Sequence, residues 1–328
     1  MDLRTKVNIE ASKFKISYNS GVMFIGSCFA SSIGQKMEEG RMPVIINPAG
    51  AVFNPVSVCN TLDNIISGKE FLKEDLSFFN DLWFSFYHYT DFSSEDPTQV
   101  LEKINKKAKD SLAFLSNASS VFFTLGTARV YKLKETGEIV SNCHKLPSSY
   151  FENSLLTVDY IVKLFSEQLD RLHSLFPQLK VVFTISPVRH WKDGAHGNQV
   201  SKSVLFLAVE ELLKHSISPG YFPAYELLMD ELRDYRFYDD DMLHPSELAR
   251  RYIWEAFSES YIEKETMSIF SDVTKITKAC KHRFNIESRS KKKEFAERMY
   301  RQIQEIETKV SVIDFSYEKR YFQNLIDS

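Results

Sequence analysis

Short uninterrupted apolar runs alternate along this chain with longer segments in which apolar residues recur every three or four positions. Runs of the first kind predict strands buried on both faces, at 21–25, 44–46, 120–125 and 180–185. Segments of the second kind predict helices, at 30–39, 54–68, 97–115 and 157–176. This alternation is typical of an α/β fold, in which helices cover both faces of a central parallel sheet.

Two further segments suggest strands outside that sheet. Residues 129–133 and 138–141 flank Thr136-Gly137, a turn pair that predicts a β-hairpin. Two interpretations stay open for an aromatic stretch, which is either a half-buried strand or a surface that stacks on a sugar. The stretch comprises Trp83, Phe84, Phe86, Tyr87 and Tyr89.

The chain after about residue 264 differs in character. It carries basic runs at 275–283 and 289–293, followed by apolar residues at helical spacing, namely Met299, Ile303, Ile306 and Val310. We interpret the basic runs as solvated helix surface rather than a site for acidic lipid, because the whole chain is slightly acidic. The sequence therefore predicts an α/β domain over 1–263 and a C-terminal helical extension over 264–328.

The candidate chemistry begins where the first predicted strand passes into the first helix, at Gly26-Ser27-Cys28. Such a turn presents a side chain at the carboxyl edge of the sheet and aims the following amides at a developing negative charge. Cysteine needs less activation than serine, so Cys28 is an alternative nucleophile. We favour Ser27, because neighbouring side chains on such a turn point apart and small buried thiols are common.

A serine nucleophile needs a base, and Asp-x-x-His occurs three times in this chain. Asp170 and His173 fall on a predicted helix, which favours a solvated helix face. Asp193 and His196 fall in a glycine-rich loop at 190–197 after a predicted strand, within reach of an active site. The third pair, Asp241 and His244, lies between an acidic, aromatic stretch and a new helix that Pro245-Ser246 would start.

Several short motifs occur in a fixed order over about residues 20–260, and together they resemble the GSCFA family, which is related to the SGNH (GDSL-like) hydrolases. They are Gly-Ser-Cys-Phe-Ala at 26–30, Asn-Pro-Ala-Gly at 47–50, Thr-Leu-Gly-Thr at 124–127, Ser-Pro-Val-Arg-His at 186–190 and Asp-Met-Leu-His-Pro at 241–245. The resemblance implies a three-layer sandwich with a central parallel sheet. It also implies a catalytic triad of Ser27, Asp241 and His244.

One motif departs from the SGNH pattern. SGNH hydrolases carry Gly-x-Asn-Asp in the third block, where the Asn side chain donates to the oxyanion, whereas this chain has Gly126-Thr127-Ala128-Arg129. Loss of one oxyanion donor lowers a rate by about a hundredfold or more. The replacement candidates are the amides of Ser27, Gly50 and Gly126, the Thr127 hydroxyl, and the side chains of Asn47, Asn54, Asn142 and Asn198.

Two interpretations stay open for the role of each of three other polar residues. Asn142 either lines the substrate site or belongs to an ordinary polar loop after the hairpin. Arg189 and His190 follow a predicted strand, where they could hold a substrate carboxylate or hydroxyl. Alternatively, Arg189 pairs with an acid at 239–241.

Composition narrows the class of protein further. With 41 basic and 44 acidic residues and no basic stripe with interleaved aromatics, a nucleic-acid partner is not expected. The amino terminus lacks an apolar secretion segment and no apolar run has membrane-spanning length, so the expected location is the cytoplasm. The four cysteines lack zinc-like spacing and are expected to be free thiols, with no metal site.

The sequence therefore predicts an ester hydrolase or acyl transferase that acts on a carbohydrate or another small oxygen ester and needs no cofactor. A competing hypothesis is a binding module for a carbohydrate-type ligand that kept the fold and lost efficient catalysis. A third is acyl transfer through Cys28. Oligomeric state is not decided by the sequence.

Overall fold

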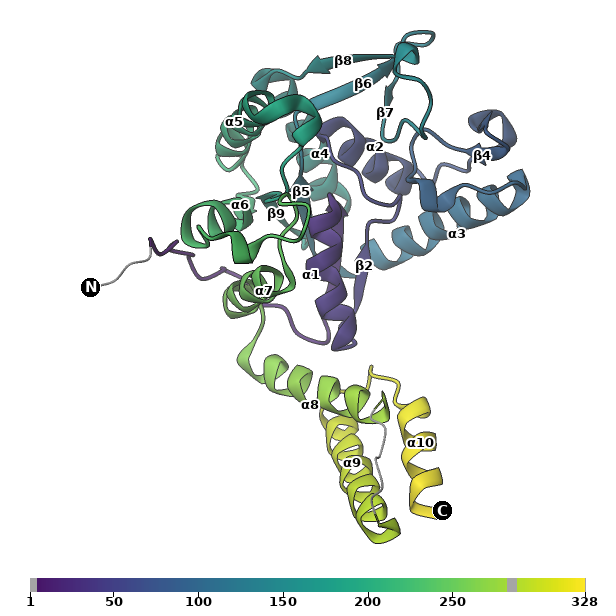
Figure 1. Ribbon diagram of the computed structural model, residues 1–328, viewed down its shortest axis with the longest axis vertical. Helices are drawn as coiled ribbons and strands as arrows, with labels where there is room; N and C mark the ends of the chain where they lie inside the picture. Colours follow the sequence, from purple (N-terminus) through teal and green to yellow (C-terminus); the bar gives the residue numbers. More distant parts are fainter. Residues whose placement is uncertain (1–4, 282–287, 328) are drawn as a thin grey trace.

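The structure is a computed structural model that describes residues 5–281 and 288–327 (Figure 1). At its centre five parallel strands lie in the order β10-β9-β5-β1-β2. Their bounds are β1 Gly21–Gly26, β2 Val44–Ile46, β5 Ala118–Leu125, β9 Lys180–Ile185 and β10 Gly220–Tyr221. The four predicted strands are confirmed to within two residues, and β10 is an additional short edge strand.

Side chains alternate along the sheet between two apolar layers, which confirms the three-layer α/β arrangement. Phe24 and Phe122 face one layer, which includes α1 (Cys28–Glu39) and α7 (Glu247–Tyr261). Ile25 and Phe123 face the other. That second layer is built from α2 (Pro55–Ile66), α4 (Val158–Leu175), α5 (Gly194–Leu212) and the end of α3 (Pro97–Leu115).

Two small antiparallel sheets lie outside the central one. The predicted hairpin is confirmed as β6 (Arg129–Leu133) paired with β7 (Ile139–Val140), and β8 (Phe151–Leu155) adds a third strand. The second sheet pairs β3 (Ser77–Phe79) with β4 (Leu82–Phe84). The aromatic stretch is therefore a strand only in its first part, because β4 ends at Phe84.

The chain ends in three helices, α8 (Lys264–Lys281), α9 (Arg289–Lys309) and α10 (Ser316–Asp327), which lie together at the lower end of Figure 1. The predicted amphipathic helix is confirmed, since Met299, Ile303 and Ile306 are buried. The helices share an apolar cluster with the α/β part, in which Phe270 contacts Trp254. The boundary near 264 stays a prediction, and residues 282–283 of the first basic run lie outside the described residues.

The end of β1 is held very close to β5. Gly26 has a φ of +148°, and a Cβ atom built on it would lie 2.2 Å from the carbonyl oxygen of Thr124. Only glycine leaves room for this approach, because the atoms that a larger residue would meet belong to the backbone of β5.

We expect Gly26→Ala to lower the free energy of unfolding by about 3 kcal/mol or more, because the two strands must separate to admit the methyl group. Gly137→Ala is the matched control. Its φ is also positive, at +75°, but nothing lies within 4 Å of the added Cβ, so we expect a loss of only about 1 kcal/mol. Denaturant unfolding of both variants measures the difference, and equal losses would contradict the close-contact explanation.

Candidate active site

Ser27 lies at the junction of β1 and α1, where the sequence predicted it. Its amide donates to the Thr124 carbonyl at 3.1 Å, and its hydroxyl caps α1 by accepting from the Phe29 amide at 3.3 Å. The residue is only 1% exposed. The serine side chain is thus fixed at the positive end of a helix dipole, which favours negative charge there.

Asn47 fixes the turn that carries Ser27. It follows β2 with a φ of +43°, a conformation that asparagine tolerates better than most residues. Its side-chain oxygen accepts from the Gly26 amide at 2.8 Å, and its side-chain nitrogen donates to the Ser31 hydroxyl at 2.8 Å. The side-chain amide of Asn47 therefore positions the turn. The sequence alone had suggested this amide only as an oxyanion donor.

Asp241 and His244 are joined by a short hydrogen bond. His244 Nδ1 lies 2.5 Å from Asp241 Oδ2, and the other carboxylate oxygen accepts from the amides of Leu243 and His244 at 2.9 Å. These hydrogen bonds lower the pKa of Asp241 to about 2, so the carboxylate is ionised at neutral pH. With Nδ1 donating to Asp241, Nε2 of a neutral His244 is left as a proton acceptor.

The other two Asp-x-x-His pairs do not form such a couple. Asp170 lies 3.4 Å from His215, and His173 is exposed on α4, as predicted for a solvated helix face. Asp193 pairs with Arg129 at 3.7 Å. The predicted loop at 190–197 is wrong in its second half, because α5 begins at Gly194 and places His196 on its exposed first turn.

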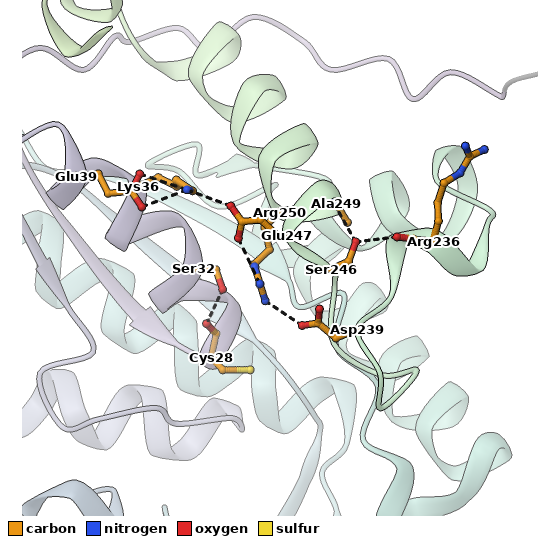
Figure 2. A network of polar contacts seen from close by, with 10 residues as sticks. All are labelled: Cys28, Ser32, Lys36, Glu39, Arg236, Asp239, Ser246, Glu247, Ala249 and Arg250. Carbon is orange, nitrogen blue, oxygen red and sulfur yellow. Dashed lines mark hydrogen bonds and ion pairs between the residues drawn. The ribbon is translucent and has the colours of Figure 1, made fainter. Parts of the chain in front are cut away.

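A polar network joins the His244 loop to α7 and α1 (Figure 2). Arg250 of α7 lies 3.2 Å from Asp239 and 3.4 Å from Glu247, and Lys36 of α1 lies 3.5 Å from Glu247. Partly exposed ion pairs of this kind contribute little stability. Their effect is geometric, since they hold the loop that begins at Asp239 beside the helix that Ser27 caps.

Electrostatic effects show that the couple lies near the start of α1. The negative charge of Asp241 contributes to the raised pKa of Cys28, after burial, which is the main cause. The charge of His244 likewise contributes to the lowered pKa of His190. Between the described residues Ser27 and His244 there is no hydrogen bond.

The hydrogen bonds do not support the oxyanion roles expected for Gly50, Gly126 and Thr127. The Gly50 amide donates to Asn47 at 2.7 Å and the Gly126 amide to Phe53 at 2.7 Å, while the Thr127 hydroxyl lies 2.9 Å from the Ser201 hydroxyl. All three groups are engaged in holding loops. The expected use of the Ser27 amide meets the same objection, since that amide is bonded to β5.

The first amides of α1 are the donors that the structure offers instead. The Phe29 amide donates to the Ser27 hydroxyl at 3.3 Å. Burial raises the pKa of the Cys28 thiol, and hydrogen bonds from the amides of Cys28 and Phe29 oppose that rise. Helix N-termini leave such amides unpaired, and they stabilise anions.

The candidate asparagines other than Asn47 are also engaged. Asn54 caps α2 through Ser57, and Asn142 accepts from the His144 amide at 2.8 Å within its own loop. These contacts fit the polar-loop interpretation of Asn142. Asn198 accepts from the His190 amide at 2.9 Å and so fixes the loop after β9.

His190 lies in the loop after β9 as a half-buried neutral imidazole. Its ring packs edge-on against Phe53, and a Cβ on Gly126 would lie 3.1 Å from its Nε2. Burial is the main cause that lowers its pKa to about 4, with smaller contributions from Lys202, His244 and Lys192. The ring is therefore uncharged at neutral pH, where it can shape a site or exchange hydrogen bonds with a substrate.

Lys202 was not singled out from the sequence, yet it lies at the centre of this region. It is 1% exposed, its Nζ donates to the Ser186 carbonyl at 2.6 Å, and burial lowers its pKa to about 7. Together with Asn198 and Ser201 it forms one buried face of α5. This face is hydrogen-bonded to the loops after β5 and β9. A helical pattern over 194–212 would have been the signal that found it.

With this geometry described, comparison with known proteins assigns the family. The GSCFA family model matches residues 21–257, which includes Ser27, Asp241 and His244. The chain belongs to the GSCFA family. A search of curated proteins finds no match.

Solved structures resemble this GSCFA chain only distantly. One is a protein provisionally described as a platelet activating factor from Streptococcus pneumonia, with 9% identity over 74% of this chain and 83% of that one, at a TM-score of 0.38. Another is a carbohydrate esterase family 3 protein from Talaromyces cellulolyticus, with 10% identity over 77% of this chain and 99% of that one, at a TM-score of 0.34.

Three further features concern membrane spans, metal sites and cysteines. Within 5–281 and 288–327, none of the helices combines the length and apolar character needed to cross a membrane. The same residues contain no group of three or more His, Cys, Asp or Glu side chains placed to hold a metal ion. The four cysteines are free thiols.

The lowered pKa of His190 predicts a pH-dependent stability. Its folded pKa, about 4, lies below the ordinary value of 6.5, so the unfolded chain binds the proton more readily in that interval. The stabilising contribution is complete above pH 6.5 and is lost as the pH falls towards 4. We expect the melting temperature to fall less steeply over this interval in His190→Gln than in the wild type. His173→Gln, at an exposed position, should follow the wild type, and three identical slopes would contradict the assignment.

Proposed function

We propose that this GSCFA protein is a serine-dependent ester hydrolase or acyl transferase, with Ser27 as nucleophile, His244 as base and Asp241 as the group that orients His244. The observation that carries the proposal is the short hydrogen bond between Asp241 and His244, on a loop held beside the helix that Ser27 caps. Hydrogen bonding to Asp241 selects the imidazole tautomer that a general base requires.

In the proposed reaction the Ser27 hydroxyl attacks the acyl carbonyl while His244 Nε2 takes its proton. The oxyanion that forms is stabilised by the first amides of α1, those of Cys28 and Phe29. As the intermediate collapses, the C–O bond to the alcohol breaks and His244 returns the proton to the departing oxygen. Water then hydrolyses the acyl-serine, or an acceptor hydroxyl takes the acyl group, and His244 again serves as base.

We extend the proposal to acetyl or other acyl esters of a carbohydrate or another small hydroxyl compound. Neither step requires a metal or an organic cofactor, because the nucleophile, the base and the oxyanion donors are all protein groups. Water and an alcohol compete for the same acyl-serine, so the acceptor present decides between hydrolysis and transfer.

The burial of Ser27 favours a second candidate function. A nucleophile that is 1% exposed and bonded to its own helix, with Ala128 where an amide side chain would donate, also fits a binding module without turnover. Such a module would bind an acylated small molecule and release no acid. Acyl transfer through Cys28 is less well supported, because burial raises the pKa of that thiol and disfavours the reactive thiolate.

We expect Ser27→Ala and His244→Ala each to lower ester turnover by about a thousandfold or more. Asp241→Asn should lower it by about a hundredfold or more, because the three residues of the proposed triad act together. Acid release from acetylated sugars and aryl acetates measures the loss. Cys28→Ala and His173→Ala are the controls and should retain activity. Melting temperatures close to the wild type would show that the inactive variants are folded.

Turnover that survives in both Ser27→Ala and His244→Ala would contradict the assignment of the triad. Activity lost only in Cys28→Ala would instead identify the thiol as nucleophile. Ligand-induced stabilisation without acid release, in the wild type, would favour the binding module.

A further inference from the structure

Arg189, in the loop after β9, is a cation without an anionic partner among the residues that the structure describes. It is half-buried and directly precedes His190, its guanidinium lies 5.4 Å from the centroid of the Trp191 ring, and its Nε is buried without a hydrogen bond. A buried donor left unpaired destabilises the folded chain, so it needs an explanation. Among the described residues Arg189 forms no ion pair.

The charge of Arg189 acts on several ionisable groups around it. The positive charge of Arg189 contributes to lowering the pKa of the buried Lys202, and it acts on the phenols of Tyr225 and Tyr238. Tyr238 pairs with Pro245, next to His244, so the charge of Arg189 acts on a residue of the loop that carries the proposed base. Arg189 is therefore a positive charge close to other ionisable groups of the site.

Four carboxylates of the neighbouring segments are held by other groups, and Asp240 is exposed and forms no ion pair with Arg189. Asp239 pairs with Arg250, Asp241 with His244 and Asp193 with Arg129, and Glu226 accepts from the Tyr221 hydroxyl. The expectation that Arg189 could pair with an acid at 239–241 is thus answered for Asp239 and Asp241, which have other partners. A guanidinium in this position fits an oxyanion from outside the chain.

We propose that Arg189 is a specificity-determining residue that binds an oxyanion of the substrate, a carboxylate or a phosphate, while the ester is held at Ser27. This rests on the proposed function and narrows it to anionic esters. The planar guanidinium suits two parallel hydrogen bonds to such a group, with Trp191 supporting its face.

Binding to Ser27→Ala protein tests this inference independently of turnover. The probes are 4-acetoxybenzoate, 4-acetoxyphenyl phosphate and the neutral 4-acetoxybenzamide, titrated by calorimetry. We expect at least one anionic probe to bind about tenfold or more tightly than the amide. Adding Arg189→Gln should abolish that preference, and Arg189→Lys should keep part of it. Arg233→Gln removes an exposed arginine paired with Asp230 and should change nothing.

Each outcome has a defined meaning. Equal affinity for the three probes, or no binding of the anionic probes at millimolar concentration, would overturn the inference. An equal loss for charged and neutral probes in Arg189→Gln would do so too, since it would indicate a structural role. Which anion is preferred distinguishes a carboxylate from a phosphate. If binding follows the prediction and the wild type releases no acid, the proposed function fails while the inference about Arg189 stands.

Discussion

The contact between the ends of β1 and β5 is the constraint on which the site depends. Because Gly26 lies against the backbone of Thr124, the chain leaves the sheet at one fixed point, and Ser27 both bonds to β5 and begins α1. Asn47 and Val52 complete the turn from the other side by bonding to Gly26. A side chain at this point has little freedom, which suits a nucleophile that must meet a carbonyl carbon in one orientation.

The loops that surround Ser27 are positioned by helices rather than by the sheet. The buried polar face of α5 holds the ends of β5 and β9 through Ser201, Lys202 and Asn198. On the opposite side Arg250 of α7 holds Asp239. Open α/β sheets bind ligands beyond the carboxyl ends of their strands, and here three layers of the fold supply groups to that edge. The result is a site that places Ser27, the exposed Asp241–His244 pair and Arg189 at one edge of the sheet.

Much of the fold follows from local patterns in the sequence. Continuous apolar runs located the buried strands, and Asn54, Thr157 and Ser246 marked helix starts that the structure confirms as side-chain caps. The helix α5 was missed, since its buried face contains Asn198, Ser201 and Lys202, which break the apolar stripe that identifies a helix. The strand β10, with two residues, is too short to show a pattern.

The residue types of the site could be predicted from the sequence, but most of its hydrogen bonds and ion pairs could not. The choice among three Asp-x-x-His pairs rested on position along the chain, and the structure forms the hydrogen bond in the chosen pair alone within the described residues. Which amides are free depends on tertiary hydrogen bonds, such as those that engage Gly50 and Gly126, and sequence carries no signal for these. The same holds for Arg189, whose lack of an ion pair among the described residues is visible only in three dimensions.

The central claim is that Ser27 is an activated nucleophile, and reaction with a fluorophosphonate probe tests it without knowledge of the substrate. Intact-mass analysis would compare the wild type with Ser27→Ala and Cys28→Ala. The account predicts one added probe mass on the wild type and on Cys28→Ala, and none on Ser27→Ala. An unlabelled wild type, or labelling that persists in Ser27→Ala, would contradict it.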